Sequence, residues 1–309
     1  MHRLRQRSHR HPSTVHRSRR GAGWDPAADR RSDRGGRLPE DAVPLILVTN
    51  DDGIRSPGLR AAAAALRTLG QVVVVAPVDQ WSGAGRCMPA TSEGRIYPET
   101  LMVNGTVIRA YAVEGTPAQV VDHAILEILP RPPDLVVSGI NYGENVGSGV
   151  TISGTVGAAL EAASFGIPAL AVSLQTPVEH HLGYSEEIDF RAAAYFTCLF
   201  AGAVLRQGLP FDVDVLKIDV PADATPETPW RWTRQSRQRY FVPVRPMRRR
   251  PTDPGPLGYR VEIDFEHLEP DSDIYALVVD HVVSVTPLSL DLTSRVSEKE
   301  LSQWWEKAR

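Results

Sequence analysis

The segment Leu45-Ile46-Leu47-Val48-Thr49 shows no alternation of polar and apolar residues, and it stops abruptly at Asn50-Asp51-Asp52-Gly53. A strand without alternation is buried on both faces, as the central strands of parallel sheets are. Such a sheet needs helices on both faces, which restricts the fold to the α/β class. Two carboxylates directly after the strand repel each other unless something positive lies there, and a hard divalent cation is the simplest candidate.

The segments that follow repeat this pattern. Residues 59–69 are alanine-rich and predict a helix, with Gly70 as its expected C-terminal cap. Residues 72–75 form a second apolar strand. Strand, helix and strand within about 30 residues make a βαβ unit, so these two strands are predicted to be parallel.

Three further apolar strands alternate with helices downstream. A polar hairpin with Asn104-Gly105 at its turn is also expected, at residues 101–113. The strands are predicted at residues 134–139, 167–174 and 213–220, and the helices at residues 116–129, 156–165 and 187–207. The predicted fold is therefore α/β, with a doubly wound, mostly parallel sheet that forms the core over residues 44–220.

Residues 221–309 differ in character and predict a C-terminal extension. Their segments have no obvious place on the core sheet. Proline and arginine are frequent through residue 258, residues 261–265 alternate like an edge strand, residues 274–285 are extended or mixed, and residues 296–307 are amphipathic.

Residues 1–43 form an Arg-rich tail with eleven arginines and five acids, a charge of about +6, against about −9 for the remainder. A disordered extension is the favoured interpretation, because the tail has too few apolar residues to order itself. A secretory signal would need an apolar region, and a transit peptide would need an amphipathic face. A nucleic-acid-binding arm rests on charge alone, and the acidic body does not attract nucleic acid, which is not an expected partner.

The composition of the 309-residue chain, 42% apolar and 23% charged, is typical of a globular protein. No apolar run approaches the roughly 20 residues of a membrane span, so no membrane association is expected. Cys87 and Cys198 form neither a metal-binding spacing nor a disulfide framework, and a cytoplasmic location is predicted.

Polar residues follow the predicted strands where ligands gather in α/β sheets, beyond the carboxyl ends. Asp51, Asp52, Ser82 and Asn141 all follow such strand ends, and their oxygen atoms suit Mg²⁺ or Mn²⁺. The alternative for each is a turn or loop residue that bonds its own backbone. Two adjacent acids are better explained by metal binding than by a turn.

Ser153-Gly154-Thr155 begins a predicted helix, where free backbone amides and two hydroxyls can hold an anion such as a phosphate group. Ordinary helix capping is an equal alternative. The chain contains no P-loop, no dinucleotide-binding glycine motif and no G-x-S-x-G motif. His180 and His181 lie in a polar loop and are expected to be solvated.

Four ordered motifs resemble the SurE family, the survival-protein-E 5′/3′-nucleotidases. They are ILVTNDDGIRSPGL at residues 46–59, Val75-Ala76-Pro77 followed by Trp81-Ser82-Gly83-Ala84, PDLVVSGIN at residues 133–141 followed by Ser153-Gly154-Thr155-Val156, and VSVTPLSLDLT at residues 283–293. The resemblance implies a metal-dependent phosphatase of nucleoside monophosphates, with one Mg²⁺ or Mn²⁺ held by Asp51, Asp52, Ser82 and Asn141. It also implies a homodimer or homotetramer that exchanges C-terminal segments between subunits.

The sequence departs from the family pattern at Gly85-Arg86-Cys87-Met88-Pro89, beside the expected substrate pocket, and at Lys217, where the family commonly has Asn. The expected mechanism is attack of an activated water on the phosphoryl group. Asp51 or Asp52 would orient that water, and Asn50 would donate a hydrogen bond to the phosphoryl group. Two alternatives are a transferase that uses the same metal site and a non-catalytic module that binds a nucleotide or a metal.

Overall fold

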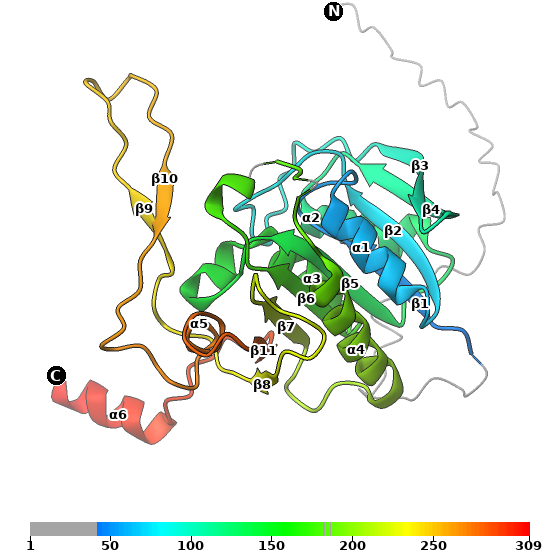
Figure 1. Cartoon of the computed structure of the whole chain (residues 1–309). Coiled ribbons are helices and arrows are strands. Elements are labelled where there is room, and N and C mark those ends of the chain that lie inside the picture. Colours follow the sequence, from blue (N-terminus) through cyan, green and yellow to red (C-terminus); the bar gives the residue numbers. More distant parts are fainter. Residues whose placement is uncertain (1–41, 182, 186) are drawn as a thin grey trace, which may run out of the picture. The chain divides into compact units, whose positions relative to one another are not determined.

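The computed structural model describes residues 42–181, 183–185 and 187–309, so the predicted tail lies outside it except for residues 42 and 43. Within this described part, the main sheet has nine strands in the order β3-β4-β2-β1-β5-β6-β7-β11-β8 (Figure 1). Neighbouring strands from β4 to β7 are parallel, whereas β3 and β11 run antiparallel to β4 and β7. The predicted α/β class with a mostly parallel sheet is confirmed.

The strands of this sheet have short, mostly buried sequences. They are β1 (Leu45–Thr49), β2 (Gln71–Pro77), β3 (Ile96–Val103), β4 (Thr106–Val113), β5 (Leu135–Tyr142), β6 (Ala169–Leu174), β7 (Val215–Val220), β8 (Trp230–Trp232) and β11 (Val283–Leu288). The remaining strands, β9 (Phe241–Val244) and β10 (Gly258–Val261), pair with each other in a separate antiparallel sheet.

Helices cover both faces of the sheet. The α-helices are α1 (Pro57–Leu66), α2 (Pro117–His123), α3 (Gly154–Ser164), α4 (Arg191–Gln207), α5 (Asp273–Val278) and α6 (Glu298–Lys307). Helix α1 packs against α4, and α2 packs against α3, so each pair forms a layer on its own side of the sheet (Figure 1). This is the doubly wound arrangement that the alternation of strands and helices predicted.

The centre of the sheet fixes where a ligand can bind. Strand β1 lies between β2 and β5, and the chain passes from β1 to β2 on one side before it returns to β5 on the other. This reversal leaves a crevice beyond the carboxyl ends of β1 and β5, which is where α/β sheets bind their ligands. The loops that leave these two strands therefore line the expected site.

Helix α1 begins with strong local signals and ends earlier than predicted. The Ser56 hydroxyl accepts a hydrogen bond from the Leu59 amide, and Pro57 occupies the first turn. The helix ends at Leu66, so Gly70 does not cap it. A Cβ at Gly70 would lie 2.4 Å from the Pro44 carbonyl oxygen, so close packing against the segment before β1 explains this glycine.

Other predicted boundaries also shift. The predicted helix at residues 116–129 is α2 followed by a π-helical turn at Ala124–Ile128, and the predicted strand at residues 134–139 continues to Tyr142. The strand predicted at residues 261–265 is wrong, because β10 ends at Val261. Residues 274–285 contain most of α5 and the start of β11.

Strand β5 carries a bulge that matters for the site. Its register with β6 shifts between Ser138 and Asn141. Gly139 has a φ of +130° and packs so closely that a Cβ there would lie 2.3 Å from the Val172 carbonyl oxygen. A bulge changes the direction in which the following side chains point, and the next polar side chain is that of Asn141.

The sheet does not stop at residue 220. Strand β11 pairs with β7, and β8 pairs with β11, so two strands from the C-terminal segment extend the core sheet. Helix α6 has no buried residue. Across the described residues, no helix combines the length and apolarity that a membrane span requires.

Candidate active site

The turn after β1 is built by Asn50 and Gly53. Asn50 is fully buried, its Nδ2 donates to the Gly53 carbonyl oxygen, and its Oδ1 accepts from the Gly53 amide, each at 3.1 Å. Gly53 has a φ of +95°, a conformation that favours glycine. Asn50 therefore shapes the turn that presents the two aspartates, and its predicted bond to a phosphoryl group stays a prediction.

Asp51 is held by the start of α3. The Thr155 hydroxyl donates to Asp51 Oδ1 at 2.5 Å, and the backbone amides of Gly154 and Thr155 also bond the carboxylate. A Cβ at Gly154 would lie 2.7 Å from Asp51 Oδ2, so only glycine allows this approach. The helix N-terminus, which favours negative charge, is thus directed at the carboxylate.

Asp52 is held by a different set of groups. Gln80 Nε2 donates to its Oδ1 at 3.1 Å, and the Tyr142 amide donates to its Oδ2 at 3.3 Å. The Tyr184 hydroxyl donates to the Asp52 carbonyl oxygen at 2.9 Å. Two segments that are distant in the sequence therefore fix this carboxylate, and a third fixes the backbone of Asp52.

The two carboxylates are electrostatically unfavourable in the protein alone. Burial raises the pKa of Asp51, although its hydrogen bonds from α3 oppose the rise. Burial and then the charge of Asp51 raise the pKa of Asp52 well above its usual value. The groups that lower these pKa values are hydrogen-bond donors, at the start of α3 for Asp51 and at Tyr142 and Gln80 for Asp52. A cation between the two would offset both effects.

Asn141 and Ser82 adjoin this pair. Asn141 Nδ2 donates to the Tyr142 and Gly143 carbonyl oxygens, at 3.2 Å and 2.6 Å, and within the described residues no hydrogen bond reaches its Oδ1. The Trp81 amide donates to the Asp51 carbonyl oxygen at 2.7 Å, which holds the loop of Ser82 against the end of β1. Ser82 itself is exposed.

This donor set fits a hard divalent cation. The two buried carboxylates, an amide oxygen and an exposed hydroxyl are oxygen ligands, which Mg²⁺ and Mn²⁺ prefer. No group of three or more His, Cys, Asp or Glu side chains that suits a metal occurs in the part of the chain that the structure describes. A cation at Asp51 and Asp52 would therefore depend on neutral oxygens and water for the rest of its shell.

The start of α3 divides the roles of its two hydroxyls. Ser153 Oγ accepts from the Val156 amide at 3.1 Å and so caps the helix, whereas Thr155 Oγ1 binds Asp51. The sequence left helix capping and anion binding open for this segment. Ser153 caps the helix, and Thr155 binds an anion, which is the protein's own Asp51 carboxylate. Its binding of a phosphate group stays a prediction.

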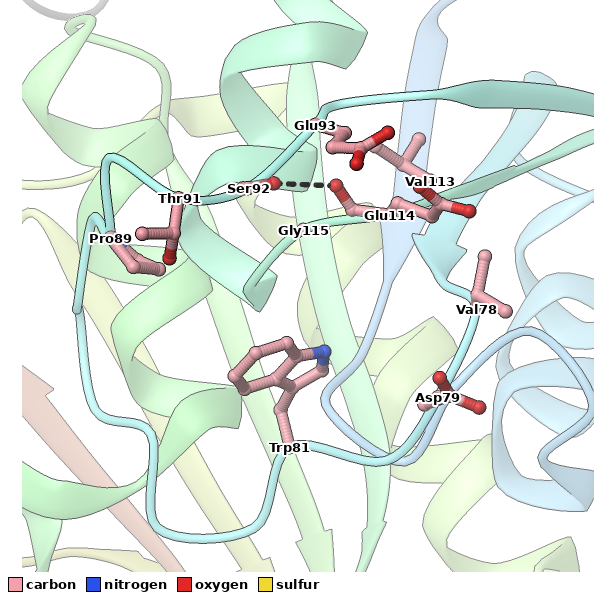
Figure 2. A pocket seen from close by; sticks show the side chains of 10 residues that line it. All are labelled: Val78, Asp79, Trp81, Pro89, Thr91, Ser92, Glu93, Val113, Glu114 and Gly115. Atoms are coloured by element: carbon pink, nitrogen blue, oxygen red, sulfur yellow. Dashed lines mark hydrogen bonds between the residues drawn. The ribbon is translucent and has the colours of Figure 1, made fainter.

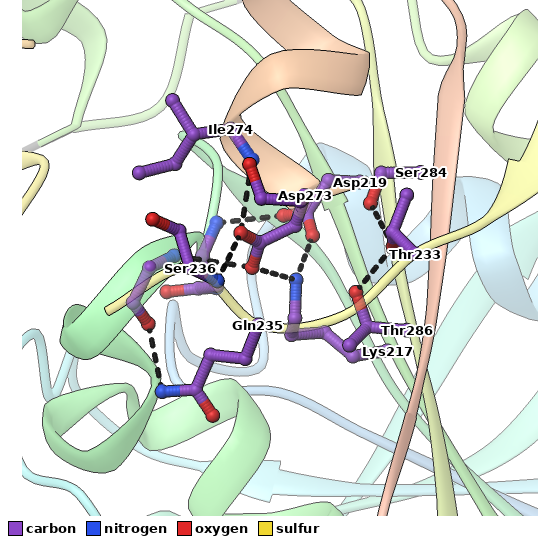
Figure 3. Close-up of polar contacts among 12 residues, drawn as sticks. Lys217, Asp219, Thr233, Gln235, Ser236, Asp273, Ile274, Ser284 and Thr286 are labelled. Carbon is purple, nitrogen blue, oxygen red and sulfur yellow. Dashed lines mark hydrogen bonds and ion pairs between the residues drawn. The ribbon is translucent and has the colours of Figure 1, made fainter. Parts of the chain in front are cut away.

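The loop after β5 is anchored by a buried charge network (Figure 3). Lys217 and Asp219 on β7 and Asp273 on α5 are fully buried, and Lys217 forms ion pairs with both acids. Asp219 Oδ1 accepts from the Asn145 amide at 2.7 Å, and Asp273 Oδ2 accepts from the Gly147 amide at 3.1 Å. The departure at Lys217 thus provides a cation that pairs with two acids under this loop.

Two residues near the site had no clear signal in the sequence. His181, expected to be solvated, is only 8% exposed. Its Nε2 lies 3.1 Å from the Thr176 carbonyl oxygen, and its Nδ1 lies 3.0 Å from the Tyr259 hydroxyl on β10. Gln80, which binds Asp52, also donates to the His181 carbonyl oxygen at 2.8 Å. His181 and Gln80 each form a hydrogen bond with a residue more than 25 positions away in the chain. The periodicity of the sequence does not reveal such contacts.

Comparison with known proteins gives a consistent set of relatives. The family model described as survival protein SurE matches residues 46–242. The 5′-nucleotidase SurE of Thermococcus gammatolerans is 45% identical over 258 residues, which are 83% of this chain and 94% of that protein. The 5′-nucleotidase SurE of Methanosarcina acetivorans is 40% identical over 85% of this chain and 98% of that protein. The crystal structure of the SurE protein from Aquifex aeolicus matches with a TM-score of 0.67 and 34% identity, and the match covers 85% of this chain and all of that one.

Proposed function

This chain belongs to the survival protein SurE family, and we propose that it is a 5′-nucleotidase that works with one divalent cation at Asp51 and Asp52. The activity follows from the relatives, since proteins named 5′-nucleotidase SurE align with more than four fifths of the chain. It therefore hydrolyses nucleoside monophosphates. The cation, and an activity on 3′-monophosphates, are finer proposals that need their own tests.

The main support for the proposed cation is the buried pair of carboxylates at the end of β1. Asp51 and Asp52 are 5% and 2% exposed, and burial raises the pKa of both. Asp51, Asp52, Asn141 and Ser82 would hold the cation, with Asn141 contributing Oδ1 and Ser82 its hydroxyl. A cation here would neutralise phosphoryl charge and lower the pKa of the attacking water.

The protein's own groups supply positioning. Thr155 and the first amides of α3 fix Asp51, and Gln80 together with the Tyr142 amide fixes Asp52. The carboxylates orient the attacking water by accepting its hydrogen bonds. Phosphoryl transfer depends mainly on positioning and on neutralisation of charge. Positioning by these fixed contacts is therefore what the protein's own groups contribute to the reaction.

Replacement of one ligand tests the proposal. Asp51→Asn keeps the shape of the side chain but removes its charge, so phosphate release from AMP should fall roughly a hundredfold or more. Release should also stop when EDTA is added to the unaltered protein and return with excess Mn²⁺ or Mg²⁺. Asp223→Asn is the control, because the Asp223 side chain is 72% exposed. Activity that survives both EDTA and Asp51→Asn would rule out the metal site.

The assembly is also a proposal. The SurE resemblance implies a homodimer or homotetramer, and the exposed helix α6 is consistent with an interface between subunits. No partner chain is needed to bring the proposed ligands together, because all four belong to one chain: Asp51, Asp52 and Ser82 lie on loops, and Asn141 lies at the end of β5. Oligomerisation is therefore separate from the formation of the metal site.

A further inference from the structure

A cavity of about 310 Å³ opens beside the loop that follows β2 (Figure 2). It lies between the loop after β2 and the ends of β3 and β4. Its lining includes Asp79, Trp81, Ser92, Glu93 and Glu114, together with apolar atoms of Val78, Pro89 and Val113. A cavity of this volume is in the range that small-molecule ligands use.

One segment of chain links the cavity to the candidate active site. Asp79 and Trp81 line the cavity, and Ser82, a proposed metal ligand, is the next residue. The Trp81 amide donates to the Asp51 carbonyl oxygen at 2.7 Å. A Cβ placed on Gly53 would lie 3.3 Å from the Asp79 carbonyl carbon, so the backbones of the two loops touch.

Trp81 gives the cavity a flat aromatic surface. Its side chain is 37% exposed, and its indole ring extends into the cavity below Ser92 and Thr91 (Figure 2). An exposed indole next to a phosphoryl site suits a nucleobase, because every base offers a face for stacking. A packing role alone would not leave the ring open to the cavity.

The negative charge of the cavity lining disfavours a ligand that places an anionic group in the cavity. Asp79, Glu93 and Glu114 are acidic, and the cavity has no basic residue among its lining. Glu114 already accepts from the Tyr97 hydroxyl at 2.6 Å and pairs with Arg95 at 3.5 Å, and Glu93 also pairs with Arg95. Within the described residues, Asp79 has no such bond, so its carboxylate can accept from a sugar hydroxyl or a base amino group.

We propose that this cavity binds the nucleoside half of the substrate, with Trp81 stacked on the base and Asp79 accepting hydrogen bonds from it or from its sugar. The inference rests on the proposed nucleotidase function and adds the determinant of its substrate class. The phosphoryl end lies at Asp51 and Asp52, and the uncharged nucleoside end lies in an acidic cavity.

The test compares a substrate that has a base with one that lacks it. For the unaltered protein, Trp81→Ala and Trp81→Phe, kcat/KM is measured for AMP and for glycerol phosphate. Trp81→Ala should lower the ratio of the two values roughly tenfold, and Trp81→Phe should restore most of it. Met88→Ala is the matched control, since Met88 lies in the same loop, is 44% exposed and does not line the cavity. An unchanged ratio in Trp81→Ala would overturn the inference.

Adenosine binding separates this inference from the proposed function. Adenosine has no phosphate, so its binding, measured by calorimetry in EDTA, needs neither turnover nor a cation. Binding that is lost in Trp81→Ala and kept in Trp81→Phe supports the cavity even if no phosphate release is found. Phosphate release together with no adenosine binding and an unchanged substrate ratio would keep the function and reject the cavity.

Discussion

Asp51 and Asp52 are neighbours in the chain, but different parts of the fold hold them. Asp51 is bound by the first residues of α3, whereas Asp52 is bound by Gln80 from the loop after β2 and by the backbone of β5. Each carboxylate thus has a fixed direction before any ligand arrives. Catalytic groups that are fixed in this way need no reorganisation during the reaction.

Glu144 is a second buried acid, in the loop that follows β5. It is 4% exposed, and its Oε2 has no hydrogen-bond partner among the described residues. Burial raises its pKa from 4.5 to about 7, although a hydrogen bond with Tyr240 opposes the rise. The folded protein therefore keeps a proton on Glu144 in a pH range where the unfolded chain has lost it.

The sign of the resulting pH dependence follows directly. Below pH 4.5 Glu144 is protonated in both states, and above pH 7 it is ionised in both. Between these values the free energy of unfolding should fall as pH rises, by about 3 kcal/mol in total at about 1.4 kcal/mol per pH unit. Glu144→Gln is neutral throughout, so it should be the more stable protein above pH 7.

Urea unfolding across this pH range measures the effect. The difference between Glu144→Gln and the unaltered protein should be near zero at pH 4.5 and should grow towards pH 7. Glu99→Gln, an exposed acid on β3, should show no such trend. A constant difference at every pH would mean that Glu144 does not bind its proton more tightly in the folded state.

At the scale of elements, the approach of α3 to β1 depends on one glycine. Gly154 has no positive φ, and alanine is the better helix former, so local preference favours Gly154→Ala by roughly 0.5–1 kcal/mol. The added Cβ would nevertheless lie 2.7 Å from both Cβ and Oδ2 of Asp51. Either the helix or the aspartate must move.

We therefore expect Gly154→Ala to lower kcat/KM for AMP by up to roughly a hundredfold, with the protein still folded. Gly149→Ala is the matched control, because a Cβ at Gly149, in the preceding 3-10 helix, has nothing within 4 Å. Steady-state rates and thermal unfolding of both variants decide the point. Full activity in Gly154→Ala would show that the contact of α3 with Asp51 has no part in catalysis.

Some elements after residue 220 are part of the core, and others form the extension. Strand β11 adds to the edge of β7, and Asp273 at the start of α5 supplies an acid to the buried pair with Lys217. Lys217→Asn, which introduces the residue that the family commonly has there, would leave the two buried acids without their cation. An unpaired buried charge is strongly destabilising in proteins. The C-terminal segment and Lys217 therefore have to be considered together.

At the scale of the whole molecule, the last helix carries a group of exposed apolar side chains. Leu301, Trp304 and Trp305 of α6 are 51%, 65% and 53% exposed. The helix has a capping box of Ser297 and Glu300, so its first turn is locally stabilised, yet it buries nothing. An exposed apolar helix face of this kind is typical of a protein interface.

We expect the full chain to be a dimer or tetramer in solution, and deletion of residues 294–309 to lower its mass towards that of a monomer. The deletion leaves β11 intact, so the sheet should be retained. Size-exclusion chromatography with light scattering gives the mass, and circular dichroism checks the fold. A monomeric full-length protein at micromolar concentration would contradict the predicted assembly.

Local signals in the sequence are sufficient to predict the α/β sheet, and they also predict a group of oxygen ligands. Apolar strands without alternation indicate a buried parallel sheet, and Asp51, Asp52 and Ser82 follow strands of that sheet, whereas Asn141 lies at the end of β5. Local chemistry also located the start of α3 and the turn at Asn104-Gly105. These features can be predicted because they depend on residues that are close together in the sequence.

The contacts that hold these groups could be known only from the tertiary structure. Nothing in the sequence shows that Thr155 binds Asp51, that Gly154 makes room for it, or that Lys217 joins Asp273 under the site loop. Trp81 was visible only as part of a motif, and its cavity depends on where the ends of β3 and β4 lie. Each of these contacts joins residues that lie far apart in the chain or on different elements, so packing of the sheet and its helices sets them.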